Sequence, residues 1–304
     1  MNGVRVKRFD RTQICIDVTI KTLYRTPEGQ HETRRTRLRT KNAIHLDNAG
    51  SRTILRFMTQ PVAQRRPNGR FRELFSASGV VAEIQPITRR MRRIRLEGDE
   101  VARLGSVPGQ HVRVHVADML DPRNWLRPRD MLRTYSIWRH DQGIELCVLD
   151  HGGDSPGVRW ARELTVGQGV SFGRPEGSFV LRDGAHHLFA GDETAAVAFG
   201  AMLRSLAPDA AAYGVIEVDE PEDRLPLDRE LQWSYRHGKP AAASTALVGE
   251  LSRLELPEEP GVAYLAGEAR TIQMLRAHLV SDRGWPRQAI RTKPFWTPGK
   301  RGMD

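Results

Sequence analysis

The pattern of apolar residues changes near Asp183-Gly184, and this change limits the possible folds more than any other feature of the sequence. Before it, apolar and polar residues alternate in short runs separated by Gly- and Pro-containing turns, which is typical of antiparallel strands. After it, short apolar runs alternate with segments of helical periodicity, which indicates a parallel sheet with crossover helices. The sequence therefore predicts two domains of different class.

The expected elements follow from this pattern. In the first part we expect strands at residues 80–84, 91–96, 111–116, 134–138, 144–149, 170–172 and 178–181, and one short helix at 159–164. In the second part we expect strands at 187–191, 212–218 and 262–267, and helices at 195–206, 245–254 and 271–280. The fold class is thus an antiparallel β-barrel or sandwich domain at 71–183, then an α/β parallel-sheet domain with a C-terminal tail at 184–304. Flavin-dependent reductases often join two such domains, which is an analogy of fold only.

The positive charge of the chain is concentrated at its N-terminal end. Of the formal net charge of +10, residues 1–57 carry +8, from 13 Lys/Arg against five acids. We expect residues 1–70 to be a basic, poorly ordered extension with one strand at 14–20, because blocks of like charge are usually solvated tails. Two alternatives stay open: an arm for nucleic acid, which we consider unlikely, and a natural start at Met58.

Composition excludes several classes of protein. No run of 18 apolar residues predicts a membrane span, and we find no signal peptide. Two cysteines, Cys15 and Cys147, cannot form a disulfide framework or a four-cysteine iron–sulfur site, so we expect a cytoplasmic protein. We also find no convincing catalytic triad or metal cluster, and expect no catalytic side chain and no metal ligand.

The strongest local signal is Arg133-Thr134-Tyr135-Ser136, at the start of an expected strand. An arginine can neutralise phosphates, an aromatic ring can lie against an isoalloxazine, and a hydroxyl can bond the reactive flavin nitrogen. Strand alternation places Arg133 and Tyr135 on one face. The alternative is an ordinary edge strand with a surface arginine.

A Gly-rich loop, residues 150–157, leads into the expected short helix. The first amides of a helix are unpaired and attract a pyrophosphate. The same residues also form an ordinary helix start, with Ser155 as N-cap and Pro156 at the first helical position. Both interpretations can hold together.

Three further motifs follow the expected parallel strands or end the chain: Gly191-Asp192-Glu193-Thr194-Ala195, Leu265-Ala266-Gly267-Glu268 and Phe295-Trp296. Strand ends are where α/β domains present ligand-binding groups, although no GxGxxG fingerprint is present here. Taken alone, the first motif is more simply a helix cap and the second an ordinary turn. The aromatic pair could cover a flavin or anchor the tail in the core.

Together these five motifs resemble, in order and spacing over residues 72–299, the siderophore-interacting protein family of ferric-siderophore reductases. The resemblance implies FAD in a ferredoxin-reductase-like barrel, an NAD(P)H-binding-like α/β domain, and reduction of ferric siderophore with release of Fe²⁺. It also implies NAD(P)H or a ferredoxin as electron donor. The cofactor contacts assigned on this basis are Arg133, Thr134, Tyr135, Ser136, His151, Gly152, Gly157, Val158, Arg159, Trp160, Asp192, Thr194, Glu268 and Trp296.

The sequence departs from the family pattern at two of these places. Val158 stands where the family has a hydroxyl, so that backbone amides, with Ser155, would carry the phosphate. Trp138 stands where the family has an arginine, with Arg139 one place later, which puts one flavin or substrate contact in doubt.

An anionic siderophore needs cations near the flavin, and Lys293, Lys300 and Arg301 are the candidates; the alternative is a solvated basic tail. Two other functions stay open. One is a flavin reductase that supplies electrons to another pathway, and the other, more distant, is a nucleic-acid-binding protein acting through its basic N-terminus.

Overall fold

The computed structural model describes residues 3–10, 13–25, 31–43, 76–117 and 132–300, in two compact units, Met1–Arg66 and Pro67–Asp304. The first unit contains an antiparallel sheet of β1 (Gly3–Asp10), β2 (Gln13–Arg25) and β3 (His31–Ala43), with β2 in the centre. The strand expected at 14–20 lies inside β2. The other two strands were not predicted, because the charged sequence of β3 has little apolar alternation.

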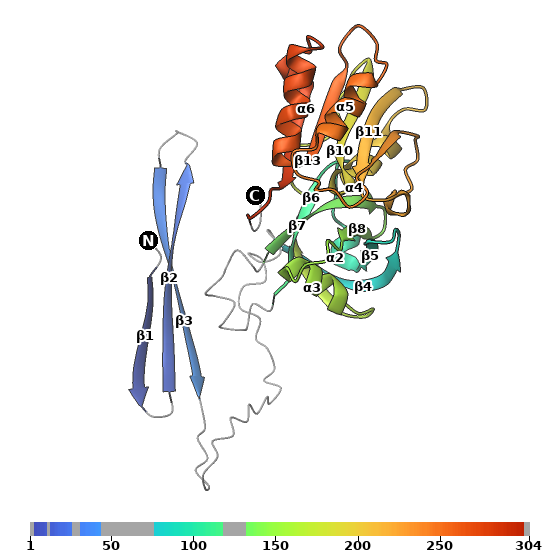
Figure 1. Ribbon diagram of the computed structural model, residues 1–304. Coiled ribbons are helices and arrows are strands. Elements are labelled where there is room, and N and C mark those ends of the chain that lie inside the picture. Colours follow the sequence, from blue (N-terminus) through green and yellow to red (C-terminus); the bar gives the residue numbers. More distant parts are fainter. Residues whose placement is uncertain (1–2, 11–12, 26–30, 44–75, 118–131, 301–304) are drawn as a thin grey trace. The chain divides into compact units, whose positions relative to one another are not determined.

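The second unit begins with a closed antiparallel barrel, with the strand order β4-β5-β8-β7-β6-β9 (Figure 1). Its strands are β4 (Ser76–Pro86), β5 (Met91–Glu97), β6 (His111–His115), β7 (Leu132–His140), β8 (Ile144–Leu149) and β9 (Gly169–Gly173). Two short helices accompany it, α2 (Asp99–Ala102) and α3 (Pro156–Glu163). Inward-facing Val, Ile and Leu side chains fill the barrel, as the alternating pattern predicts.

The strand predicted at 178–181 is wrong. This segment is irregular, and it follows Gly177, whose φ of 108° is one that other residues rarely adopt. Phe179 of the segment is buried, which explains why its residues alternate like those of a strand. Here the alternation of apolar residues indicates which side chains are buried, but it does not indicate that the backbone forms the hydrogen bonds of a sheet.

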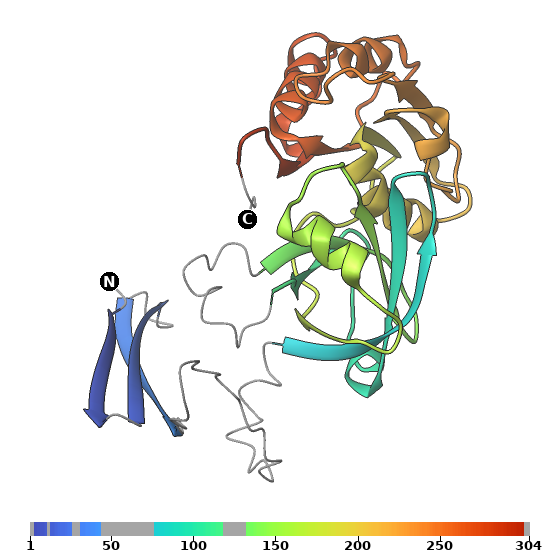
Figure 2. The ribbon, with the colours of Figure 1, turned by 60° about the horizontal axis from the view of Figure 1, so that its bottom comes forward.

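The chain then forms a five-stranded parallel sheet in the order β12-β11-β10-β13-β14 (Figure 2). Its strands are β10 (His186–Asp192), β11 (Ala211–Val218), β12 (Gln232–Tyr235), β13 (Val262–Glu268) and β14 (Ile290–Trp296). The helices are α4 (Glu193–Ser205), α5 (Thr245–Arg253) and α6 (Ala269–Ser281), with single 3₁₀ turns η3 (Pro221–Asp223) and η4 (Arg287–Ala289). The predicted fold class is confirmed, although β12 and β14 were missed.

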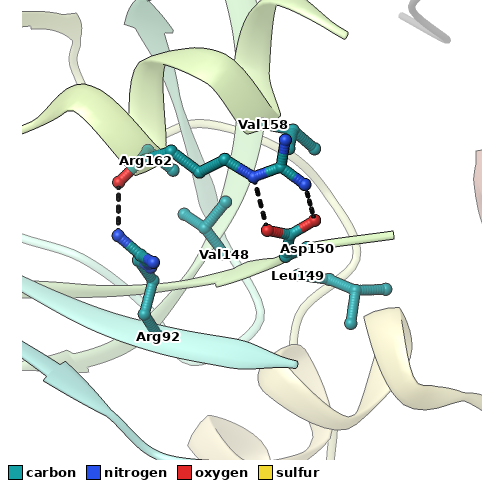
Figure 3. Close-up of a pocket in the computed structure, with 7 residues that line it drawn as sticks. Arg92, Val148, Leu149, Asp150, Val158 and Arg162 are labelled. Atoms are coloured by element: carbon teal, nitrogen blue, oxygen red, sulfur yellow. Dashed lines mark hydrogen bonds and ion pairs between the residues drawn. The ribbon is translucent and has the colours of Figure 1, made fainter. Parts of the chain in front are cut away.

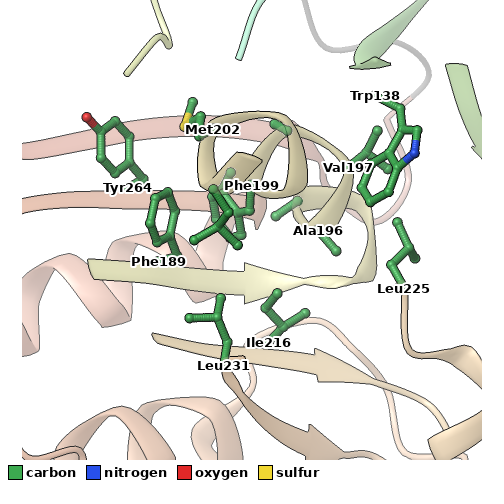
Figure 4. Packing of buried hydrophobic residues seen from close by; sticks show 14 of the residues in the cluster. Trp138, Phe189, Ala196, Val197, Phe199, Met202, Ile216, Leu225, Leu231 and Tyr264 are labelled. Carbon is green, nitrogen blue, oxygen red and sulfur yellow. The ribbon is translucent and has the colours of Figure 1, made fainter. Parts of the chain in front are cut away.

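The two faces of this sheet have different partners. Leucines of α5 and α6, such as Leu247 and Leu275, cover one face. On the other face, α4 lies between the sheet and the barrel, and Phe199 of α4 packs against Phe189 of β10 (Figure 4). Because Met91, Trp138 and Cys147 of the barrel belong to the same cluster, the two domains share one apolar core.

Trp138 packs directly against the sheet domain. It lies in β7, is 4% exposed, and its ring rests on Gly200 of α4, where a Cβ would overlap the ring. The guanidinium of Arg204 covers the indole, 4.9 Å from the ring centroid, and its Nη1 donates to the Trp138 carbonyl at 2.9 Å. The departure from the family pattern at this position is therefore a packing residue between domains.

We expect Gly200→Ala to lower the free energy of unfolding by ~2 kcal/mol, because the added methyl must displace a buried indole. Gly249→Ala in α5 is the matched control. Its Cβ would meet only Arg253, at 3.9 Å, so the better helix propensity of alanine should stabilise by ~0.5–1 kcal/mol. Denaturant unfolding of both variants checks this. Equal changes in unfolding free energy at the two sites would show that the Trp138 ring does not require a glycine at position 200.

Candidate cofactor site

Residues of the Arg-Thr-Tyr-Ser motif and of α3 meet at one side of the barrel. A Cβ added at Gly157, in the first turn of α3, would lie 2.6 Å from the Tyr135 hydroxyl and 3.1 Å from Cγ of Arg133. Both side chains therefore leave β7 on the face that meets the helix. The Tyr135 ring also stacks on Trp160 of α3, with centroids 5.7 Å apart. Burial raises the pKa of the Tyr135 phenol, against the positive charge of Arg133, so the phenol stays neutral.

This arrangement fits the phosphate end of FAD. The start of α3 offers backbone amides, Arg133 adds a fixed cation beside them, and Gly157 leaves the approach clear of a side chain. Ser155 is the N-cap as predicted, and its hydroxyl accepts from the Val158 amide at 3.4 Å. Val158 is buried and its side chain has no hydrogen-bonding atom, so it cannot replace the hydroxyl expected there from the family pattern.

The position of α3 is fixed by charged contacts to the barrel (Figure 3). Nε and Nη2 of Arg162 donate hydrogen bonds to the two carboxylate oxygens of Asp150 at 2.7 and 2.6 Å, and these bonds lower the pKa of the Asp150 carboxyl. Arg92 of β5 donates to the Ala161 carbonyl at 2.9 Å. Between these contacts is a small pocket, lined by Arg92, Val148, Leu149, Asp150, Val158, Ala161 and Arg162. Both arginines hold the helix that would present its amides to the cofactor.

The loop before α3 is exposed. Gly152 has a φ of 81°, and its amide donates to Asp150 at 3.0 Å. Nε2 of His151 lies 3.3 Å from the Ser155 hydroxyl, and Nε of Arg159 lies 3.8 Å from a carboxylate oxygen of Asp154. The side chains of His151 and Arg159 are therefore near the helix start but reach toward solvent.

Thr134 and Ser136 lie on the opposite face of β7 from Arg133 and Tyr135, and all four residues of the motif pair with β6. Ser136 is the cross-strand partner of His111, and Thr134 that of Arg113. His111 is buried; burial lowers its pKa, and so does the positive charge of Lys293, while Glu176 opposes them. Lys293 belongs to β14, so the candidate substrate cation acts on a barrel residue beside the motif. Lys300 is exposed and Arg301 lies outside the described residues.

Asp192 lies at the carboxyl end of β10, where the strand order reverses and open α/β sheets bind ligands. It is 3% exposed, and each of its carboxylate oxygens accepts two bonds. Oδ1 accepts from the Thr194 amide at 2.9 Å and hydroxyl at 2.5 Å. Oδ2 accepts from the Glu268 amide at 2.9 Å and from Nε1 of Trp296 at 2.8 Å. One carboxylate thus joins the ends of β10, β13 and β14.

The motif glycines permit this junction. Gly191 lies against the Ala266 backbone. Gly267 has a φ of 120°, and the Asp192 carboxylate occupies the space that a side chain at position 267 would need. Glu268 caps α6, accepting from the amides of Arg270 and Thr271 at 2.9 and 2.8 Å. Burial acts to raise the pKa of Glu268, but these bonds and the Ala243 amide outweigh it and leave it lowered. Capping therefore accounts for the local geometry of Asp192, Thr194 and Glu268, and their contact with a cofactor stays a prediction.

A buried charge network beside this junction was not predicted. Glu193 is held by Arg236 through two bonds of 2.6 and 2.7 Å and by Arg90 at 3.0 Å. Arg90 comes from the β4–β5 turn of the barrel and also bonds Asp223 at 3.1 Å. Glu217 completes the network, since its carboxylate lies 3.7 Å from Nη1 of Arg236. It also accepts a hydrogen bond from Ser244 at 2.5 Å, and burial raises its pKa. No local pattern marks Arg90 or Arg236, because their partner Glu193 lies 103 and 43 residues away.

Among the described residues, no helix has the length and apolar character that a membrane crossing requires. Among the same residues, no three His, Cys, Asp or Glu side chains gather in a way that could hold a metal ion.

Comparison with known proteins identifies relatives of both domains. The model of the siderophore-interacting FAD-binding domain matches residues 80–179, and that of siderophore-interacting protein matches 184–299. Ferric vibriobactin reductase ViuB of Vibrio cholerae is 27% identical over 186 residues, 58% of this chain and 68% of that protein. A siderophore utilization protein from T. fusca is 25% identical with a TM-score of 0.65, covering 75% of this chain and 95% of that one. Phthalate dioxygenase reductase, 17% identical with a TM-score of 0.55 over 74% of this chain and 70% of that one, shares the fold.

We expect Arg236→Met to lower the free energy of unfolding by ~3 kcal/mol, because it leaves Glu193 buried with only part of its counter-charge. Arg253→Met is the control: this arginine bonds Glu250 at 2.8 Å but is exposed, so the loss should be under ~1 kcal/mol. Chemical denaturation measures both. A loss at Arg236 no larger than at Arg253 would show that the network contributes little.

The pH dependence of stability should carry the signature of Asp192. Burial, and then the charge of Glu193, raises its pKa from 3.8 to about 6, so the native state keeps a proton that the unfolded state loses. Stability from this group is present below about pH 4 and is lost as pH rises toward 6. Relative to Asp192→Asn, the wild type should lose ~3 kcal/mol of unfolding free energy between pH 4 and 7. A difference that is flat with pH would refute the shift.

Proposed function

Because the chain belongs to the siderophore-interacting protein family, we propose that it is an FAD-dependent oxidoreductase that reduces ferric siderophore and releases the iron as Fe²⁺. The observation that carries the proposal is the meeting of Arg133, Tyr135 and Gly157 at the start of α3. It supports the proposal because a cation, an aromatic ring and the amides of a helix start are groups that bind the phosphates and the ring of a flavin. It lies within the segment that matches the FAD-binding domain.

The residues of the chain would bind and orient, and the cofactor would supply the redox chemistry. FAD accepts two electrons together and releases them singly, as reduction of Fe³⁺ to Fe²⁺ requires. Arg133 would neutralise its phosphates, Tyr135 would lie against it, and Ser136 would hydrogen-bond its reactive edge. Trp296 would contribute an aromatic surface from the sheet domain.

Electrons would come from NAD(P)H at the carboxyl edge of the sheet, or from a ferredoxin. Asp192 and Glu268 already cap the helices at this edge, so a dinucleotide would be held by other groups there. Lys293 would attract an anionic ferric siderophore to the side of β7 that carries Ser136, with Lys300 and Arg301 as further cations. The free, buried thiol of Cys147 suits a reducing compartment, and we place the reaction in the cytoplasm.

The first experiment is the visible absorption spectrum of the purified full chain, with chromatography of the released chromophore. A yellow protein that releases FAD supports the proposal, and a colourless protein that cannot be reconstituted with FAD overturns it. Anaerobic reduction of a ferric siderophore by NADH, NADPH or reduced ferredoxin, followed with a colorimetric Fe²⁺ chelator, then tests the substrate. Fast turnover of free flavin or of a protein acceptor with slow turnover of the siderophore would instead favour an electron-supply reductase.

We expect Gly157→Ala to raise the Kd for FAD about tenfold, or ~1.4 kcal/mol, since its methyl displaces Tyr135 and Arg133 from the helix start. Gly169→Ala, in β9 of the same barrel, is the control, because no atom lies within 4 Å of the added Cβ. Fluorescence titration of the apoprotein with FAD measures both. Equal affinities in the two variants would remove the start of α3 from the proposed site.

A further inference from the structure

The indole of Trp296 is anchored by a single side chain. Nε1 donates to Oδ2 of Asp192 at 2.8 Å, although the two residues are 104 positions apart in the sequence. Trp296 is only partly buried at the end of β14, so packing alone does not fix its ring. The register of β13 and β14 shifts between Gly267 and Glu268, and this irregularity sets Trp296 opposite Glu268.

Asp192 has no oxygen left for a ligand. A carboxylate oxygen has two lone-pair positions, and both oxygens of Asp192 already accept two bonds each. The residue is also 3% exposed and closed off by Gly267. It can therefore act at the site only through the groups that it holds.

Two of those groups are side chains, the Thr194 hydroxyl and the Trp296 indole. The hydroxyl belongs to a residue whose backbone amide Asp192 also binds, so Trp296 is the side chain whose position depends most on Asp192. The Thr194 and Glu268 amides are backbone groups of α4 and β13, so the helix and the strand fix their positions. The indole of Trp296 can rotate about two side-chain torsions, and no secondary-structure element fixes these torsions.

We propose that Asp192 is a positioning residue, which fixes the indole of Trp296 at the carboxyl edge of the sheet. The role of that indole toward FAD rests on the proposed function. The anchor itself does not, and it can be measured without cofactor.

The test uses the ¹⁵N-labelled full chain in its apo form. Its six tryptophans give six indole N–H signals, and the signal that disappears in Trp296→Phe assigns Trp296. In Asp192→Asn the amide offers one oxygen to four donors, so one pair of donors loses its acceptor. Asp192→Ala removes both oxygens, and in this variant we expect hydrogen exchange of the Trp296 indole to accelerate at least tenfold, with the other five indoles unchanged. Unchanged exchange at Trp296 in Asp192→Ala would overturn the proposal.

A double-mutant cycle on FAD binding links the anchor to the site. If Asp192 acts through Trp296, Asp192→Asn should raise the Kd for FAD several-fold in the wild type and less than twofold in Trp296→Phe. Additive effects would show that Asp192 acts independently of the indole, against the proposal. Should the wild type bind no FAD, the proposed function fails, and indole exchange alone decides the anchor.

A measurement on the wild type covers the case in which the Asp192 variants do not fold. The Trp296 indole shift should titrate with a midpoint near the Asp192 pKa of about 6, because protonation weakens the acceptor. The charged groups that interact with Asp192 are Glu193, Glu217 and Arg236, and of these Glu193 has the largest effect on its pKa. An indole shift that does not change between pH 4.5 and 7.5 would count against the anchor.

Discussion

The pairing of Glu193 with two arginines holds the arrangement on which the site depends. A carboxylate buried this deeply is tolerated only when it is paired and hydrogen-bonded. Arg236 supplies one partner from the sheet edge, and Arg90 supplies the other from a turn of the barrel. Because the two arginines belong to different domains, the charge is compensated only when both domains are in place. These ion pairs thereby fix the position of β7, which carries the Arg-Thr-Tyr-Ser motif, relative to the sheet edge that carries Asp192.

The family motifs have a structural role in addition to the cofactor role that we propose for them. In both Gly-Asp and Gly-Glu motifs the acid caps the following helix, while the glycine lets a neighbouring strand or side chain approach. Capping and ligand binding are usually treated as competing explanations for such residues. Here Asp192 serves as cap, strand junction and anchor at once, so the motif residues specify the shape of the sheet edge before any ligand arrives.

Much of this could be predicted from the sequence, and what could not was non-local. Ser155 as N-cap, the common face of Arg133 and Tyr135, and the barrel-then-sheet order each follow from a few adjacent residues. The pairing of Arg90 with Glu193 and the bond from Trp296 to Asp192 join residues about a hundred positions apart, and no local pattern marks them. The strand expected at 178–181 failed because burial of Phe179 imitates the alternation of a strand. Short strands such as β12 have too few residues to show any period.

The contact between Trp138 and Gly200 has a consequence for how such a chain can change over time. The resemblance to the family implies an arginine at position 138, and a flexible arginine would leave room for a side chain on α4. Once tryptophan occupies that position, glycine at 200 becomes a requirement, and Arg204 acquires a ring to cover. The order of events is thus constrained: position 200 had to be small before the tryptophan could be accepted, and a larger residue cannot return at position 200 while the tryptophan remains. Among close relatives these two positions should therefore vary together, although they lie in different domains.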